Sequence, residues 1–204
     1  MYDYCRYFLV IFAGIILATV LCARTPDLKF VPAGPFRMGS NYNLPDEGPS
    51  HYVFVSAFRV DSVEVTVIHW DEITAWAQKH GYEFDSRTRT AKRGPSWSPS
   101  PQEHPMNMVN WYDTVKWCNA RSESEGRTPA YYEDVEWTRV YRKGKVDLGN
   151  DQVNWLASGY RIPSEAEWEK AARGGLVGAK YPWGNSLDGS KGNYRLSGDL
   201  FDNA

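Results

Sequence analysis

"GYRIPSEAEWEKAARGG", residues 159–175, contains a complete helix with its start and stop signals between two glycine turns. Ser164 can cap the first free amides, and Glu167 three residues later can reach back to the cap, which is the capping-box arrangement. One of the two final glycines can take the left-handed conformation that ends the last turn. The apolar face at i, i+3, i+4 spacing consists of Trp168, Ala171 and Ala172. The stretch therefore predicts a helix that begins near Ser164 and buries this face.

Composition limits the class of protein. The chain has 204 residues, a formal charge of −2 and a pI near 6.1, which fits one domain with a sizeable core or part of a larger one. Its Lys and Arg residues are scattered among acids, so no basic stripe is present to bind nucleic acid. With 9 Trp and 13 Tyr, many of them beside Gly, Pro, Asn or Ser, the sequence predicts a loop-rich fold built around buried rings.

The first segment differs from the rest of the chain. Residues 7–23, "YFLVIFAGIILATVLCA", carry no charge, and polar residues follow at once. This pattern predicts a signal peptide over residues 1–23 and an exported, periplasmic or extracellular domain over residues 24–204. The apolar run is a little shorter than the roughly 20 residues of a transmembrane helix, so an uncleaved anchor is the alternative and the one route to the membrane. Lipid attachment at Cys22 is disfavoured because Val20 and Leu21 are bulky.

After the leader, two segments read as short strands and two as helices. The strands lie in residues 30–38 and 51–58, with Pro and Gly at the turns. The first helix follows Thr66 as cap and ends at Gly81. The second runs from about Trp111 to Glu125, with Asn110 at its start. The expected buried faces are Trp70, Ile73 and Ala77 on the first helix, and Trp111, Val115 and Cys118 on the second.

The remaining segments are less regular. Residues 131–160 predict a β-hairpin with Val135, Trp137 and Val140 in its first strand, before a "KGK" turn. Residues 181–204 form a glycine-rich coil without a regular period. Because no closing strand or capped helix follows, we expect the domain to be incomplete at its C-terminus. The whole pattern predicts an irregular α+β fold.

Motifs for catalysis or metal binding are sparse. The histidines, His51, His69, His80 and His104, have neither the i, i+4 pairing of a zinc site nor another short ligand spacing. No nucleophile elbow, P-loop or dinucleotide fingerprint is present. Once the leader is removed, Cys118 is the remaining cysteine. It is expected either to be a small buried hydrophobe or to have a disulfide partner in sequence that this chain does not contain.

Asn193 and Asp199 lie in flexible coil beside glycines. Their side-chain oxygens, with neighbouring carbonyls, suit a hard cation such as calcium. An ordinary Asn/Asp/Gly turn has the same composition, and spacing alone favours that turn.

Five ordered motifs together resemble one family. They are "FVPAGPFRMGS" (30–40), "DSVEVT" (61–66), "HPMNMVNWYDTVKWCN" (104–119), the stretch 159–175 and "YPWGN" (181–185). The chain resembles the formylglycine-generating enzyme, or sulfatase-modifying factor, family from residue 30 to residue 204. The resemblance implies a compact, irregular α+β fold related to C-type lectins, in which the helix after Ser164 is scaffold.

The resemblance also implies an activity and its partners. Complete members oxidise a cysteine of a sulfatase to formylglycine, using oxygen and a copper(I) ion held by two cysteines near the family's C-terminus. This chain ends before that region, so we expect no catalytic residues and no copper site in it, and no activity on a sulfatase or other peptide substrate by this chain alone. The family binds structural calcium at positions that match Asn193, Tyr194, Asp199 and Phe201, so the resemblance favours calcium over a bare turn.

Two other classes of function stay open. A non-catalytic, lectin-like binding module would use exposed aromatic side chains such as Trp97, Trp155 and Trp183 to stack on sugar rings, although packing inside the fold is the more common role of such rings. An iron-dependent oxygenase of the same superfamily would need a histidine spacing that the sequence does not have.

Overall fold

The computed structural model describes residues 27–41, 47–85, 103–186 and 191. The elements follow the order of two strand pairs, two helices, a short 3-10 turn and a last helix. They are β1 (Leu28–Val31), β2 (Gly34–Met38), β3 (His51–Val55), β4 (Phe58–Asp61), α1 (Val67–Lys79), α2 (Trp111–Ser124), η4 (Asn150–Gln152) and α3 (Glu165–Arg173).

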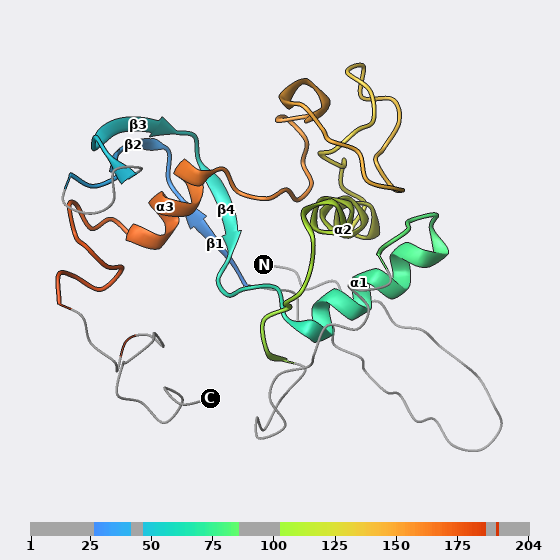
Figure 1. Ribbon diagram of the computed structural model, residues 1–204, viewed down its shortest axis with the longest axis horizontal. Helices are drawn as coiled ribbons and strands as arrows, with labels where there is room; N and C mark the ends of the chain where they lie inside the picture. Colours follow the sequence, from blue (N-terminus) through green and yellow to red (C-terminus); the bar gives the residue numbers. More distant parts are fainter. Residues whose placement is uncertain (1–26, 42–46, 86–102, 187–190, 192–204) are drawn as a thin grey trace, which may run out of the picture.

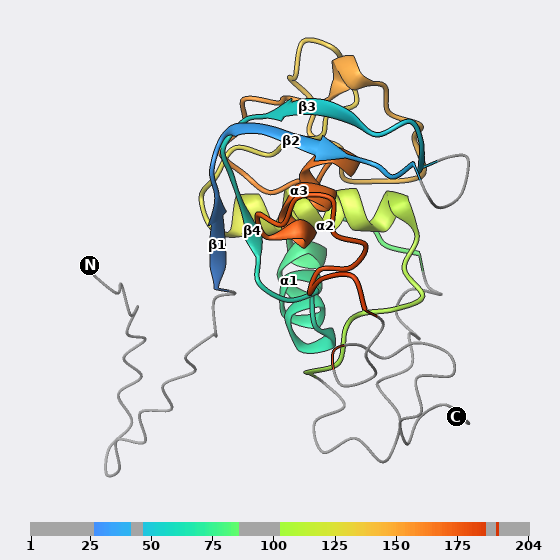
Figure 2. The same ribbon diagram turned by 90° about the vertical axis from the view of Figure 1, so that its left-hand side faces the viewer.

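The four strands form one long, bent hairpin. β1 pairs with β4 and β2 with β3, both antiparallel. The pairing Val31↔Phe58 in one arm continues as Gly34↔Val55 in the other, so the register is unchanged across the bend. Figure 2 shows β1 passing into β2 and β3 into β4 with a change of direction. The predicted strands are confirmed, since β1 and β2 lie in the first predicted segment and β3 and β4 begin in the second. Pro32 and Gly34 lie where the first arm bends.

α1 and α2 pack together and carry the core of the helical half. Both predicted caps are confirmed: Thr66 Oγ1 accepts from His69 N at 3.4 Å, and Asn110 Oδ1 accepts from Asp113 N at 2.9 Å. The indoles of Trp70 and Trp117 stack at 5.4 Å between centroids. The buried cluster is Trp70, Val115, Trp117, Cys118, Ala130, Tyr131, Tyr141 and Val153.

The predicted buried face of α2 needs one correction. Val115 and Cys118 are buried, but Trp111 at the first turn is 46% exposed. Its ring meets Tyr112 edge-on instead of entering the core. The reason is its position: Trp111 is the first helical residue, beyond the part of α2 that α1 covers.

The predicted hairpin over residues 131–160 is wrong. The structure has isolated bridges, Tyr131↔Val153 and Tyr132↔Val140, in place of two strands. Buried Asn119 of α2 replaces a strand partner: its Nδ2 donates to the carbonyls of Tyr131 (2.7 Å) and Tyr141 (3.1 Å). Its Oδ1 accepts from the amides of Ala130 (3.2 Å) and Tyr131 (3.0 Å). Since one side chain satisfies four backbone groups, this segment needs no regular sheet.

α3 has the predicted boundaries and an unexpected orientation. Ser164 and Glu167 form the capping box, and Gly174 ends the helix in the left-handed region at φ 54°. Trp168, however, is 65% exposed, whereas Glu167 is buried. α3 is held to the hairpin by polar contacts: Lys170 Nζ donates to the carbonyls of Pro32 (2.8 Å) and Gly34 (2.9 Å). These bonds fix the rotation of the helix, so that Trp168 of the expected apolar face is exposed and Ala171 and Ala172 are only half-buried.

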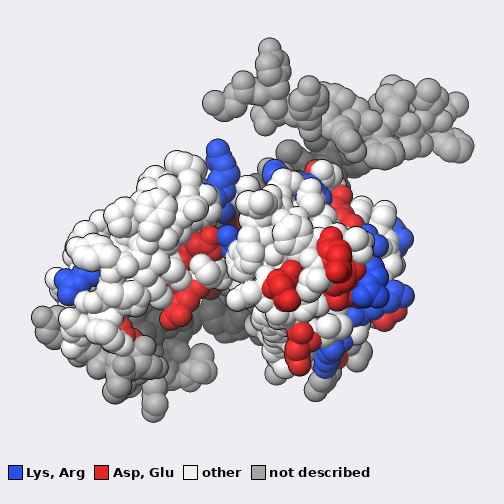
Figure 3. Space-filling model, turned by 90° about the horizontal axis from the view of Figure 1, so that it is seen from above, with Lys and Arg blue, Asp and Glu red and all other residues white. Residues whose placement is uncertain are grey.

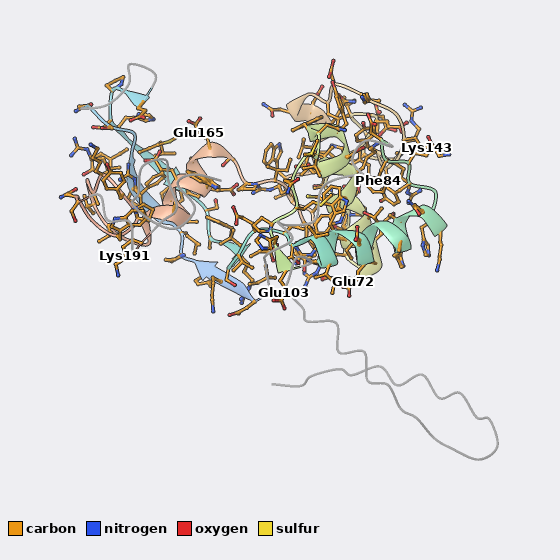
Figure 4. All side chains as sticks on the ribbon, turned by 60° about the horizontal axis from the view of Figure 1, so that its bottom comes forward. Glu72, Phe84, Glu103, Lys143, Glu165 and Lys191 are labelled. Atoms are coloured by element: carbon orange, nitrogen blue, oxygen red, sulfur yellow. The ribbon has the colours of Figure 1, made fainter. Side chains whose placement is uncertain are left out.

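The described chain has two halves (Figure 1). The hairpin and α3 form one half, and α1, α2 and residues 127–158 form the other. Figure 4 shows Glu165 and Lys191 on the hairpin half, and Glu72, Phe84 and Lys143 on the helical half. None of the described helices has the length and apolar character needed to cross a membrane.

Candidate functional site: the cleft between the two halves

An open cleft lies between the hairpin half and the helical half. Its volume is about 1880 Å³. The hairpin and α3 line one side, and α2 with residues 155–163 line the other. Residues 159–164 join the two halves and are the first part of the stretch 159–175. The width of the cleft therefore depends on how this segment is held.

Gly159 fixes this segment against α2. A Cβ at Gly159 would collide with Ser122 Oγ and with the carbonyl of Thr128, so glycine is required by close approach. The next amide, Tyr160 N, donates to Ser122 Oγ at 2.7 Å, and that hydroxyl donates to the carbonyl of Cys118 at 2.7 Å. The chain is thus bonded to the buried face of α2 before it crosses to α3.

A buried ion pair joins the two halves at the floor of the cleft. Arg121 of α2 binds Asp61 of β4 through two hydrogen bonds, Nη1 to Oδ2 at 2.7 Å and Nη2 to Oδ1 at 3.1 Å. The guanidinium carbon of Arg121 lies 3.7 Å from the centre of the Tyr160 ring. Such a bidentate pair is directional, so it orients β4 relative to α2 as well as attracting it.

A second bidentate pair holds the start of α3. Arg161 donates to Glu167 at 2.7 Å (Nη1–Oε2) and 2.6 Å (Nη2–Oε1). These bonds, with the amide of Ser164 at 2.8 Å, lower the pKa of Glu167 below its usual range. Glu167 is therefore an ionised structural anchor and not a proton donor near neutral pH.

Charge in the cleft differs from charge on the whole chain. Eight lining residues are Lys or Arg and three are Asp or Glu, although the chain carries a net charge of −2. Most of these cations are bound by carboxylates or, for Lys170, by backbone carbonyls. Arg37 donates to Ser50 Oγ, and Arg59 lies over the ring of Phe30 at 5.7 Å. The cleft is lined mainly by apolar side chains, and most of its cations are already paired.

Cys118 lies at the bottom of this cleft as a buried thiol. Burial raises its pKa to about 12, with a smaller opposing effect of Arg121. The thiolate is the nucleophile and the metal ligand, so this cysteine is unreactive near neutral pH. Within residues 27–41, 47–85 and 103–186 it is the one cysteine, and no three His, Cys, Asp or Glu side chains come together to hold a metal. A copper(I) site of two thiolates does not fit these residues.

The histidines have individual structural contacts. His51 Nδ1 lies 2.9 Å from the carbonyl of Pro49, and His80 Nδ1 lies 2.7 Å from that of Trp76. His69 is half-buried with its ring edge-on to Trp117, and burial lowers its pKa. The structure does not gather these side chains into one site.

Several predicted site residues lie outside the described part of the chain. These are Asn193, Tyr194, Asp199 and Phe201, together with Trp97 and the predicted signal peptide, residues 1–23. Of the other two aromatic candidates, Trp155 is half-exposed at the cleft, and Trp183 stacks on Tyr181 at 5.6 Å. The cleft itself was not predicted, because its walls come from segments far apart in sequence; the paired charges at 61 and 121 carry no local signal.

Comparisons with known proteins agree with this architecture. The model of the family described as sulfatase-modifying factor enzyme 1-like domain matches residues 18–202. The chaperone protein LppX of Paenibacillus barcinonensis is 38% identical over 166 residues, which are 78% of this chain and 50% of that protein. The formylglycine-generating enzyme of Thermomonospora curvata is 30% identical over 178 residues, 82% of this chain and 55% of that protein.

The fold agrees as well. The crystal structure of CarF superposes with a TM-score of 0.59 and 26% identity over 77% of this chain and 62% of that one. The α+β, loop-rich fold is thereby confirmed. The chain spans about half the length of these curated relatives.

Proposed function

The chain belongs to the sulfatase-modifying factor enzyme 1-like family, and from that premise we propose that residues 1–204 supply scaffold for a formylglycine-generating-type domain without performing the oxidation themselves. The family reaction oxidises a sulfatase cysteine with oxygen at a copper ion held by two cysteines. The three cysteines of this sequence are Cys5 and Cys22 in the leader, and Cys118.

The observation that carries the proposal is the state of Cys118. Its thiol is buried in the core of the helical half, and burial raises its pKa to about 12. A copper(I) ion prefers soft thiolates, and a single protonated thiol cannot provide two of them. What the described residues do supply is a cleft whose walls are held by bidentate ion pairs. Such a cleft suits the positioning of a polypeptide and not the oxidation of its cysteine.

The test is an oxidation assay on the purified chain. It would be incubated with copper(I), oxygen and a cysteine-containing sulfatase peptide, and the peptide mass followed. We expect no conversion of the thiol to an aldehyde, while the Thermomonospora curvata enzyme converts the same peptide in parallel. Copper-dependent turnover by residues 1–204 would overturn the proposal, and Cys118→Ala would then show whether this thiol takes part.

A second candidate is a non-catalytic binding module. The open cleft with its exposed apolar side chains favours it, and so does the similarity to a protein named as a chaperone. A module of this kind binds a polypeptide or a glycan and releases it unchanged. Binding of an unmodified sulfatase peptide, or of soluble glycans, measured by tryptophan fluorescence with no change in ligand mass would favour this function over the first.

We also propose that calcium stabilises the C-terminal coil and that the protein is exported. Asn193 and Asp199 offer side-chain oxygens, and Tyr194 and Phe201 offer carbonyls, which are donors that calcium prefers. Export is supported by the uncharged run before Arg24. N-terminal sequencing of the secreted protein is expected to begin near Arg24, and a start at Met1 in the membrane fraction would favour an anchor.

A further inference from the structure

Four exposed apolar side chains surround the short turn η4 on the helical half. Val135 is 52% exposed, Trp137 40%, Trp155 50% and Leu156 90%. We call them the indole patch. Their segments meet at η4: Gln152 Nε2 donates to the carbonyl of Glu133 at 2.9 Å, and both indoles bind carbonyls of the turn. Large exposed rings next to one another are typical of binding surfaces.

Trp137 is held in an unusual conformation. Its φ of 56° lies in the left-handed region, where a bulky residue is rare. The preceding turn keeps it there: Asp134 accepts from the amides of Thr138 (2.8 Å) and Arg139 (3.1 Å). The indole Nε1 then donates to the carbonyl of Asp151 at 2.9 Å. Strain of this kind persists where surrounding contacts enforce it, and it clusters at functional sites.

Trp155 is fixed in the same way from the other side of η4. Its Nε1 donates to the carbonyl of Asn150 at 3.2 Å, the residue before Asp151. The guanidinium of Arg161 lies 5.0 Å from the centre of the ring and is itself tied to Glu167. Both indole N–H groups thus donate to backbone carbonyls of η4, which fixes the two rings and leaves their faces for contact with a ligand. Ordering such rings costs little further entropy when a ligand binds.

The cations around the patch are paired, and the charges left without a partner are negative. Each Lys or Arg from residue 127 to residue 161 has a carboxylate partner: Arg127–Glu125, Arg139–Asp134, Arg142–Glu123, Lys143–Glu83, Lys145–Asp85 and Arg161–Glu167. Glu136, beside Trp137, and Asp151, whose carbonyl holds that indole, are exposed and have no side-chain partner among the described residues. Figure 3 shows acidic and basic side chains beside one another on this half, as these ion pairs require.

We propose that the indole patch is a docking site for an extended peptide segment that carries Arg or Lys side chains. A cation over an indole face is attracted by the ring quadrupole, and Arg161 already uses Trp155 in this way. The unpaired carboxylates of Glu136 and Asp151 add charge-assisted hydrogen bonds. The aliphatic stems of Arg and Lys fit the exposed Leu156 and Val135.

The same geometry ranks a basic peptide above a glycan. A sugar ring would also stack on an indole, but the free polar groups here are carboxylates with full charge, which bind cations more strongly than they bind neutral hydroxyls. Most of the patch lies outside the cleft, and the inference does not depend on the oxidation reaction or on calcium.

The test compares three labelled peptides of equal length that differ at four positions only. These positions carry Arg in the first peptide, Gln in the second and Glu in the third. Fluorescence anisotropy with the purified chain is expected to show binding of the Arg peptide at 50 mM NaCl, at least tenfold tighter than that of the Gln peptide. Affinity is expected to fall severalfold at 500 mM NaCl, because screening weakens exposed charge pairs. Equal binding of the Arg and Gln peptides would overturn the proposal, and so would salt-independent binding of soluble glycans at Trp137.

Variants localise the site. Trp137→Ala and the double variant Glu136→Gln with Asp151→Asn are each expected to weaken the Arg peptide about threefold to tenfold. The matched controls, Trp111→Ala and Glu72→Gln, remove an exposed indole and an exposed carboxylate elsewhere on the helical half (Figure 4 labels Glu72) and are expected to leave affinity unchanged. The double variant changes exposed side chains only, so it is expected to fold even if Trp137→Ala does not. Full affinity for the Arg peptide in the double variant would disprove the docking site.

Discussion

Arg121 of α2 and Asp61 of β4, 60 residues apart in sequence, form a bidentate ion pair that joins the helical half to the hairpin. The Arg121 side chain is buried, and Tyr160 covers one face of its guanidinium. Because a bidentate pair is directional, this contact orients β4 and the hairpin relative to α2.

The first prediction removes one member of this pair. Asp61→Asn and Arg121→Met are each expected to lower the free energy of unfolding by about 3 kcal/mol. Asp61→Asn leaves the buried Arg121 with only its longer contact to Glu125 at 3.5 Å, and Arg121→Met leaves the half-buried Asp61 carboxylate without this partner. Urea denaturation measures the change. Arg121→Lys is expected to restore only part of the stability, because an ammonium cannot make the bidentate contact.

The control for that experiment is the exposed pair Lys143–Glu83. Lys143→Met is expected to cost less than about 1 kcal/mol, as exposed pairs do. Equal losses at Lys143 and Arg121 would show that burial of the Arg121–Asp61 pair has no special effect.

The second prediction concerns Asn119. Asn119→Leu keeps the volume of the side chain but leaves three buried backbone groups without a partner, since the carbonyl of Tyr131 keeps its bond from the amide of Tyr141. We therefore expect a loss of about 3 kcal/mol or more in the free energy of unfolding. Hydrogen exchange would locate the effect, with faster exchange at the amides of Ala130 and Tyr131. Asn185→Ala removes one exposed bond to the amide of Lys180 and serves as the control, with a much smaller effect.

The third prediction is a pH dependence from His69. Burial lowers its pKa in the folded protein, with a smaller contribution from Arg121, so the unfolded chain binds the proton more readily. Stability is therefore fully present above about pH 6.5, the usual pKa of His, and falls as the pH is lowered below it. The free energy of unfolding in urea is expected to be lower at pH 5.5 than at pH 7.5.

A histidine variant isolates this effect. His69→Gln is expected to flatten the profile between these two pH values, whereas the exposed His51→Gln keeps the slope of the wild type. Glu167 does not interfere, because its lowered pKa places its titration at more acidic pH. A slope that survives in His69→Gln would assign the pH dependence to another group.

The fourth prediction tests calcium. A ligand that binds only the folded state stabilises it by mass action, so millimolar calcium is expected to raise the melting temperature. Asp199→Ala is expected to abolish the increase, and the exposed Asp71→Ala to retain it. A wild-type melting curve that calcium leaves unchanged would return residues 193–201 to an ordinary turn.

Local signals predicted most of the secondary structure. Thr66, Asn110 and Ser164 each placed a helix start correctly, because capping depends on residues three apart. The alternating Val53 and Val55 and the flanking Pro and Gly residues located the strands. These features need no knowledge of what lies across the fold.

Tertiary contacts decided the features that the sequence did not predict. Trp168 was expected in the core because of its spacing, but Lys170 binds the hairpin's carbonyls and turns the ring outward. The hairpin expected after Tyr131 was replaced by contacts to Asn119, a residue on another element. The cleft and the indole patch likewise arise from segments that meet only after folding.

The unbroken register of the bent hairpin has a consequence for protein engineering. One extra residue in a single strand at the bend, next to Pro32 or Ser56, would either form a bulge or turn every side chain of one arm to the opposite face of the ribbon. Residues added between Ser40 and Glu47 lie beyond the last pair, Met38↔His51, and shift no pairing. The tip of the hairpin is therefore the natural point at which to insert an epitope or a fluorophore while every strand keeps its partner.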